Sequence, residues 1–205
     1  MSDQRPLLRI VLATANAGKT AEIEAILEAE LGSLVHLEPR PAGLGEIEET
    51  GETLEENARL KAAAVAAEAG LPAIADDTGL EVEALDGAPG VHSARYSGPE
   101  ATYASNVAKL LESLDGVTER AAVFRTVAIV CWPDGRELVA DGLVRGRIAE
   151  RAAGEGGFGY DPVFVPDECG GRSFAELTLE EKNDVSHRGR AFRALAGRLR
   201  SSIGP

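Results

Sequence analysis

A chain of 205 residues, with 44% hydrophobic and 27% charged residues, has the composition of a single globular domain. Its formal net charge of −13 excludes a general nucleic-acid binder, because such a protein needs a basic surface to hold phosphates. No apolar run approaches the roughly 20 residues that a membrane span requires, and the short polar start does not fit a signal peptide, so we expect a cytoplasmic protein.

The first predicted strand, at residues 8–13, leads into a turn that is typical of anion-binding sites. A helix follows the turn and carries an apolar face as far as Leu31. A strand, a turn of small residues and a helix place backbone N–H groups at a helix N-terminus, where anions bind. The candidate phosphate-binding residues are Thr14, Ala15, Asn16, Ala17, Gly18 and Lys19.

The tripeptide Gly18-Lys19-Thr20 also fits the end of a Walker A loop, which would indicate a kinase or an ATPase. That pattern needs a glycine five positions before Gly18, and this position is Ala13. We therefore favour a phosphate-binding turn of another kind. An ordinary strand-to-helix connection with a surface lysine is the alternative.

An acidic segment precedes the second predicted helix. A short strand is predicted at residues 35–37, and Glu48 and Glu49 then stand before Thr53-Leu54-Glu55-Glu56, a capping box for a helix that runs to about Ala69. Acids before a helix usually face solvent or complement the helix dipole. They gain a functional meaning here only if they meet the acidic pair of the next motif.

Two adjacent aspartates, Asp76 and Asp77, follow the apolar residues 71–75, which we predict to be a short strand that ends at this pair. Adjacent carboxylates repel each other, and a divalent cation with a phosphate ligand would hold both, since Mg²⁺ takes carboxylate and phosphate oxygens together. Alternation does not decide which aspartate faces the site, because the strand ends there. Residues 81–85 alternate like a further, half-buried strand.

The second half of the sequence predicts a long antiparallel hairpin. A polar loop at residues 91–98 precedes a helix from about 102 to 114. Residues 121–132 and 137–148 carry the strongest strand pattern, with the turn Pro133-Asp134-Gly135 between them. An antiparallel pair of this length indicates a mixed sheet.

Glycines surround two aromatic residues in the segment 154–162. Glycine lets a ring approach a ligand closely, so Phe158 or Tyr160 would stack on a base, whereas the alternative is that both rings cap the core. A short strand is predicted at residues 163–165. The last helix begins at Ser186-His187-Arg188, which either offers several donors to a ligand or simply caps the helix.

Six motifs follow one another in a fixed order. They are Thr14-Ala15-Asn16-Ala17-Gly18-Lys19, Glu48-Glu49-Thr50-Gly51, Ala75-Asp76-Asp77-Thr78-Gly79-Leu80, Ser93-Ala94-Arg95-Tyr96-Ser97-Gly98, Gly157-Phe158-Gly159-Tyr160-Asp161-Pro162 and Ser186-His187-Arg188. Each motif alone is weak or moderate, but the ordered set resembles the inosine/xanthosine triphosphate pyrophosphatase family over residues 8–199.

This resemblance implies an α/β fold with a long, mixed, twisted sheet flanked by helices, and two lobes around a central cleft. It implies one catalytic domain over residues 1–205, a homodimer and dependence on Mg²⁺. The implied reaction is hydrolysis of deaminated purine nucleoside triphosphates (ITP, dITP, XTP and dXTP) to the monophosphate and pyrophosphate, which cleanses the nucleotide pool. The remaining alternatives are a P-loop-like kinase or ATPase and a nucleotide sensor that does no chemistry.

Carried over by position, the resemblance also assigns roles to residues. Asp77 would be the catalytic carboxylate and a metal ligand, with Glu48 or Glu49 as a further metal ligand, and the triphosphate would lie on Thr14–Lys19. The other substrate-binding residues would be Thr78, Phe158, Gly159, Tyr160, Asp161, Lys182, His187 and Arg188. Ala15 and Thr78 depart from the glycine and serine that are usual in the family.

Overall fold

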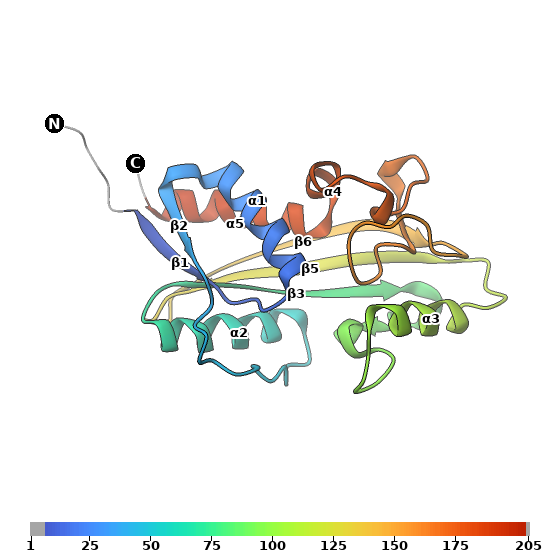
Figure 1. Ribbon diagram of the computed structural model, residues 1–205, viewed down its shortest axis with the longest axis horizontal. Helices are drawn as coiled ribbons and strands as arrows, with labels where there is room; N and C mark the ends of the chain where they lie inside the picture. Colours follow the sequence, from blue (N-terminus) through green and yellow to red (C-terminus); the bar gives the residue numbers. More distant parts are fainter. Residues whose placement is uncertain (1–6, 204–205) are drawn as a thin grey trace. The chain divides into compact units, whose positions relative to one another are not determined.

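The computed structural model describes residues 7–203, in which a sheet of seven strands is flanked by helices (Figure 1). The strands are β1 (Leu8–Leu12), β2 (Val35–Glu38), β3 (Ala73–Val82), β4 (Pro89–Gly90), β5 (Ala121–Cys131), β6 (Glu137–Ile148) and β7 (Phe164–Pro166). Their order is β2-β1-β3-β5-β6-β7, and β4 pairs with β3. β1 is parallel to β2 and β3, whereas β4 is antiparallel to β3 and β7 to β6, so the predicted mixed sheet is confirmed.

The helices begin where the sequence supplies caps. They are α1 (Ala17–Leu31), α2 (Leu54–Ala69), α3 (Tyr103–Ser113), α4 (Leu179–Val185) and α5 (His187–Ile203). The threonine before α2, α3 and α4 (Thr53, Thr102 and Thr178) forms a capping box in each case, which satisfies N–H groups that the first helical turn leaves unpaired. Between Leu7 and Ile203, none of the helices combines the length and the apolar character that a membrane span needs.

Internal contacts divide the chain into two compact units. The first unit comprises residues up to Asp77, residues 127–141 and the chain from Ala191 onward, and the second comprises residues 78–126 and 142–190. The strands β3, β5 and β6 and the helix α5 each contribute residues to both units. Each predicted site residue therefore belongs to one of the two units.

The core of the first unit fixes the direction of side chains on β3. Ile74 on β3 packs in one cluster with Ile10 on β1, Leu27 on α1 and Leu195 on α5. Figure 1 shows α1 and the later part of α5 over one face of this part of the sheet and α2 over the other. Because neighbouring strand residues point to opposite faces, Asp76 points with Ile74 toward α1 and α5.

The core of the second unit contains a group of aromatic rings among aliphatic side chains. The Phe124 ring on β5 contacts the Phe164 ring edge-on, with centroids 4.7 Å apart, and the Phe174 ring at 6.2 Å. Leu80 on β3 and Leu110 on α3 belong to the same buried cluster. This cluster supports the glycine-rich loop, because the loop residue Tyr160 is one of its members.

β3 is longer than the sequence predicts. The prediction ended a strand at Asp76 and Asp77 and began another at residue 81, but β3 runs without a break from Ala73 to Val82, and residues 83–85 form a 3-10 helix. The chain turns only at Asp86, which adopts the left-handed conformation with φ 51°. The boundary at the acidic pair was wrong because lysines from two helices offset the charges and let the strand continue. The predicted strand at residues 163–165 is shifted by one residue to β7.

Candidate functional site

The turn between β1 and α1 is closed by its own side chains. Asn16 caps α1, because its Oδ1 accepts hydrogen bonds from the backbone N–H groups of Gly18 (3.0 Å) and Lys19 (3.2 Å). Thr14 Oγ1 accepts one from the N–H of Asn16 at 3.1 Å. These N–H groups are thus already engaged, and the Lys19 ammonium is the positive group that the turn presents.

Asp76 and Asp77 face opposite sides of β3. Asp76 forms an ion pair with Lys19 of α1, with 3.1 Å between Nζ and Oδ2, and its side chain is fully buried. Asp77 points to the other face, where Lys61 of α2 donates a hydrogen bond to its Oδ1 at 2.9 Å. Each carboxylate has its own lysine, which explains how two adjacent acids are accommodated inside a strand.

Lys61 joins Asp77 to one of the two predicted glutamates. Its Nζ also donates to Glu49 Oε1 at 2.8 Å, so one ammonium bridges two carboxylates. Glu49 is half-buried, whereas Glu48 is exposed. Of the two glutamates, the structure places Glu49 beside Asp77.

The protonation equilibria at this cluster follow from burial and from its charges. Burial raises the pKa of the Asp77 carboxyl; the Lys61 ammonium opposes this rise, and the Glu49 carboxylate adds to it. Burial alone would lower the pKa of Lys61, but the carboxylates of Asp77, Asp76 and Glu49 outweigh burial and raise it. Lys61 is therefore held in its charged form, as a cation that bridges Asp77 and Glu49.

The acidic loop before α2 is fixed by hydrogen bonds from the first turn of that helix. Asn57 Oδ1 accepts a hydrogen bond from the N–H of Gly51 at 2.8 Å, and Glu56 Oε2 accepts those of Glu52 (2.7 Å) and Thr53 (3.0 Å). The first turn of α2 thus holds the loop that carries Glu49, while its third turn carries Lys61. One helix positions both partners of Asp77.

The donor set beside Asp77 fits a hard cation only in part. Asp77 Oδ2 is buried and has no hydrogen-bond partner among the described residues, and Glu49 brings further carboxylate oxygens nearby. Across residues 7–203, however, no group of three or more His, Cys, Asp or Glu side chains is arranged to hold a metal ion. A cation bound here would take its remaining ligands from elsewhere, and phosphate oxygens are the natural source.

In the second unit, the glycine-rich loop is held by a buried ion pair. Asp161 Oδ2 accepts a hydrogen bond from the N–H of Phe158 at 2.7 Å and contacts Lys182 Nζ of α4 at 2.5 Å. Asp161 and Lys182 are each only 3% exposed. A Cβ on Gly157 would lie 2.2 Å from Asp161 Oδ2, so glycine is required at this position.

The two aromatic residues of the loop have different environments. Tyr160 is buried in the core, where its hydroxyl donates to the carbonyl of Ser93 at 2.9 Å, and burial raises its pKa. Phe158 is half-buried, and the Lys182 Nζ and Arg188 Cζ atoms lie 4.7 Å and 5.4 Å from its ring centroid. Phe158 is therefore the ring with access to a ligand, and Tyr160 anchors the loop. Gly159 between them takes the left-handed conformation, with φ 63°.

The start of α5 brings further predicted residues together. Arg188 is buried, and its Nη2 donates to Thr78 Oγ1 at 3.1 Å, while Thr78 Oγ1 lies 2.7 Å from Thr126 Oγ1. The His187 ring packs 4.4 Å from the Phe124 ring. Ser186 Oγ accepts the N–H of Gly189 and so caps this helix. In the second unit, Arg188 thus connects Thr78, through a hydrogen bond, to the Phe158 ring, which Lys182 also approaches.

Two residues of these networks were not predicted as site residues. Lys61 lies on the same face of α2 as Asn57 and Val65, which are both fully buried. A lysine on a buried face needs partners, and this is the signal in the sequence that would have identified it. Thr126 offers no comparable signal, because threonine is common in strands whether or not its hydroxyl has a role.

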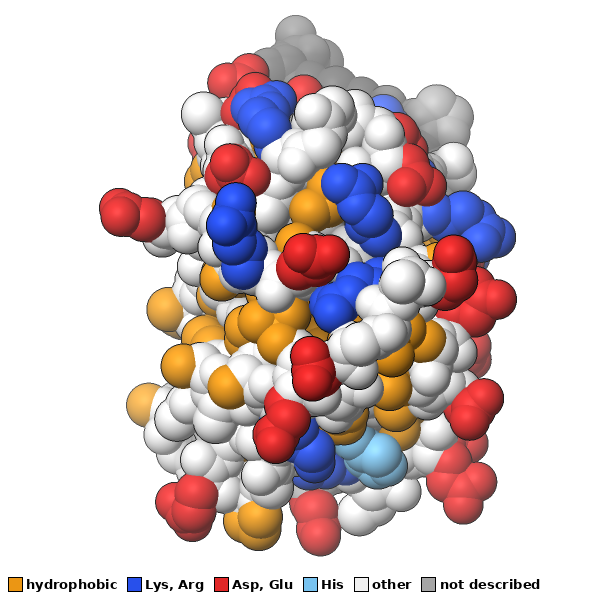
Figure 2. Space-filling view, turned by 90° about the vertical axis from the view of Figure 1, so that its right-hand side faces the viewer, with side chains coloured by type: hydrophobic (Ala, Val, Ile, Leu, Met, Phe, Trp, Pro, Cys, Tyr) orange, Lys and Arg blue, Asp and Glu red, His pale blue; other side chains and the backbone are white. Residues whose placement is uncertain are grey.

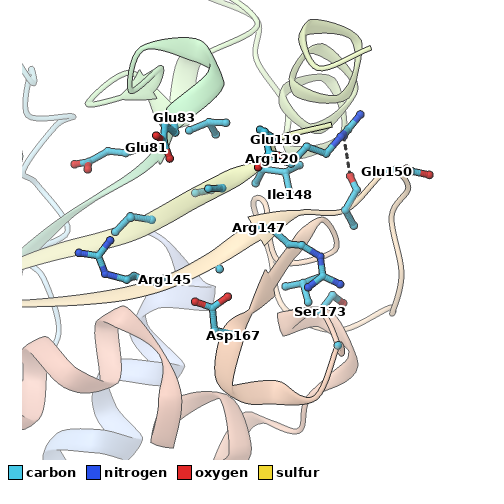
Figure 3. A pocket seen from close by; sticks show the side chains of 18 of the residues that line it. Glu81, Glu83, Glu119, Arg120, Arg145, Arg147, Ile148, Glu150, Asp167 and Ser173 are labelled. Carbon is cyan, nitrogen blue, oxygen red and sulfur yellow. Dashed lines mark hydrogen bonds between the residues drawn. The ribbon is translucent and has the colours of Figure 1, made fainter. Parts of the chain in front are cut away.

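A separate cavity of about 1140 Å³ lies in the second unit, beside β5 and β6 (Figure 3). It is lined by side chains of both signs, among them Glu81, Arg145, Arg147 and Asp167, and it contains none of the predicted site residues. Figure 2 likewise shows acidic and basic side chains interspersed over one face of the molecule. We do not assign the nucleotide to this cavity.

Gly51 provides a test of how the acidic loop is held. A Cβ at Gly51 would lie 2.6 Å from Glu56 Cβ and 2.7 Å from Asn57 Oδ1, whereas one at Gly45, in the same loop, would meet nothing within 4 Å. Gly51→Ala is expected to lower the unfolding midpoint by several degrees, since such overpacking typically costs about 1–3 kcal/mol. Gly45→Ala is the matched control. Thermal unfolding of both variants by circular dichroism is the measurement, and equal midpoints would contradict the tight packing at Gly51.

Comparison with known proteins identifies the family. The model of the Ham1 family matches residues 10–198. The chain is 50% identical over 200 residues to a protein from Deinococcus deserti named dITP/XTP pyrophosphatase (96% of this chain and 92% of that one). It is 50% identical over 195 residues to a protein of the same name from Geobacter sulfurreducens (94% and 97%). The solved HAM1 protein from Coxiella burnetii superposes with a TM-score of 0.86 at 40% identity, covering 95% of this chain and all of that one. The chain belongs to the Ham1 family.

Proposed function

We propose that this protein is a hydrolase that converts deaminated purine nucleoside triphosphates, dITP, ITP, XTP and dXTP, to the monophosphate and pyrophosphate. The observation that carries the proposal is the cluster in which Lys61 bridges the buried Asp77 and the half-buried Glu49, in a chain about half identical to proteins named dITP/XTP pyrophosphatase. In this proposal, residues 1–205 make up one catalytic domain. The family resemblance further supports a homodimer that works in the cytoplasm.

Mg²⁺ is the cofactor that the donor set supports. The free Oδ2 of Asp77 and the carboxylate of Glu49 would hold it, and phosphate oxygens of the substrate would complete its coordination. When bound, the ion offsets the negative charge that develops on the pyrophosphate leaving group. Glu48 is exposed and takes no part in this proposal.

The protein's own groups divide the remaining work. Asp77, held at Oδ1 by Lys61, orients or deprotonates a water molecule that attacks the α-phosphorus. The bond between the α-phosphorus and the bridging oxygen then breaks, and pyrophosphate leaves with that oxygen. The turn Thr14–Lys19 holds the triphosphate, chiefly through the Lys19 ammonium, which must then be shared between Asp76 and the phosphates.

The base is selected by the residues of the second unit. Phe158 would stack on the purine, and Lys182 and Arg188, which lie close to its ring, would donate to the carbonyl at position six of hypoxanthine or xanthine. Adenine carries an amine at that position and would leave these donors unpaired. This mismatch costs on the order of 1–3 kcal/mol, or about one to two powers of ten in rate. Guanine shares the carbonyl, so its rejection needs a contact at the two-amino group.

A nucleotide panel tests the proposed reaction. With Mg²⁺ present, ITP, dITP and XTP are expected to be hydrolysed at least tenfold faster than ATP, a ratio of about one power of ten or more from the donors that adenine mismatches. They are also expected to be hydrolysed faster than GTP, whose rejection needs a contact at the two-amino group. Pyrophosphate is the expected direct product. The measurement is separate detection of pyrophosphate and orthophosphate without added pyrophosphatase. Direct release of orthophosphate would instead support an ATPase, and tight binding of ITP without turnover would support a sensor.

Lys61 provides a test of how Asp77 is held. Lys61→Met is expected to lower kcat for ITP and to destabilise the protein by about 3–5 kcal/mol, because the buried Asp77 carboxylate and the half-buried Glu49 carboxylate lose their shared cation. Removing that cation also raises the pKa of Asp77, so the acidic limb of the kcat profile moves to higher pH.

The matched control for Lys61 is Arg136→Ala, which removes a cation paired with Asp134 on the exposed hairpin turn. Urea unfolding and pH–rate profiles of both variants are the measurements. If the Lys61→Met enzyme had the same kcat profile and stability as the control, the Lys61 bridge between Asp77 and Glu49 would contribute to neither catalysis nor stability.

A further inference from the structure

Tyr103 contacts the aromatic ring that we propose as the base platform. The Tyr103 and Phe158 rings lie 6.0 Å apart between centroids, with their planes tilted by 39°. This distance and tilt are within the range in which aromatic pairs attract each other. Tyr103 and Phe158 are distant in sequence, so the contact depends on the fold of the second unit.

The position of Tyr103 is fixed by the start of α3. Tyr103 is the first residue of this helix and follows its N-cap, Thr102. Thr102 Oγ1 accepts the N–H of Ser105 at 3.1 Å, and Ser105 Oγ accepts the N–H of Thr102 at 2.8 Å. The helix N-terminus is therefore rigid, and it presents the Tyr103 ring to the loop from a defined point.

Phe158, in contrast, lies between Gly157 and Gly159, which both take positive φ values. Its backbone N–H is tied to Asp161, but no hydrogen bond acts on an apolar ring, so the orientation of the ring depends on its neighbours. Among the described residues, its neighbours include the cations of Lys182 and Arg188 and the ring of Tyr103. The two cations are needed for the base in the proposed function, whereas the Tyr103 ring has no part there and can support the Phe158 ring when a base is bound.

We propose that Tyr103 is a positioning residue for base binding, which holds the Phe158 ring in the orientation that stacks on the purine. This inference rests on the proposed function, because it assigns Phe158 to the base. Tyr103 is 49% exposed, so its ring contributes little to the core. Its role is confined to the base, and it does not act on the triphosphate.

The test compares Tyr103→Ala, Tyr103→Phe and Leu179→Ala. Leu179 is the matched control, because it is also 49% exposed and is also the first residue of a helix with a threonine N-cap. The probes are ITP, measured by KM and kcat, and inorganic tripolyphosphate, which has no base, measured as a competitive inhibitor with Mg²⁺. Tyr103→Ala is expected to raise KM for ITP by about threefold to tenfold, with little change in kcat, because an aromatic pair is lost. Tyr103→Phe restores most of the affinity, and inhibition by tripolyphosphate is the same in all variants.

Three outcomes would overturn the proposal while leaving the proposed function intact. These are a KM for ITP in Tyr103→Ala equal to that of Leu179→Ala, an equal loss of affinity for ITP and tripolyphosphate, and a failure of Tyr103→Phe to restore affinity. The last two would indicate a general structural role or a role of the hydroxyl. A wild-type protein that does not hydrolyse ITP would remove the proposed function itself, and the inference with it.

Discussion

Two consecutive carboxylates inside one strand are the constraint on which this structure depends. Asp76 and Asp77 are both buried, and β3 passes through them without a break. Burying a carboxylate without a partner costs more free energy than the net stability of a folded protein, so each aspartate must pair with a cation. Because strand neighbours point to opposite faces, the two cations must come from opposite sides of the sheet. The helices α1 and α2 supply them as Lys19 and Lys61.

The two aspartates differ in how they share their lysines, and this difference supports the proposal that Asp77 carries the chemistry. Asp76 is fully buried, and its pairing with Lys19 ties β3 to the turn between β1 and α1. Asp77 shares its lysine with Glu49, so that one ammonium serves two carboxylates. Burial of that carboxylate raises its pKa, which makes it a better proton acceptor than an exposed aspartate. We therefore propose Asp77, whose lysine serves two carboxylates, as the reactive group.

Local patterns in the sequence predict the elements well and the cluster less well. The capping box of α2 and the β5–β6 hairpin follow from short-range rules, and the structure confirms them. The continuation of β3 through Asp77 depends on Lys61, about 16 positions before Asp77, and on Lys19, about 57 positions before Asp76. A local sequence pattern cannot predict contacts over such separations. Long-range contacts also decide that Glu49, and not Glu48, lies beside Asp77, and that Tyr160 is buried. The functional prediction rests on the order of the six motifs along the chain and not on any single motif.

The most direct test of this account is Asp77→Asn, which keeps the shape of the side chain and removes its negative charge. The measurement is kcat for ITP with Mg²⁺, alongside the thermal unfolding midpoint of the same preparation. The account predicts that turnover falls by a factor of about 10² or more, in the range expected for loss of a general base, while unfolding stays cooperative. A variant that folds and turns over ITP within about threefold of the wild type would show that the chemistry does not depend on Asp77.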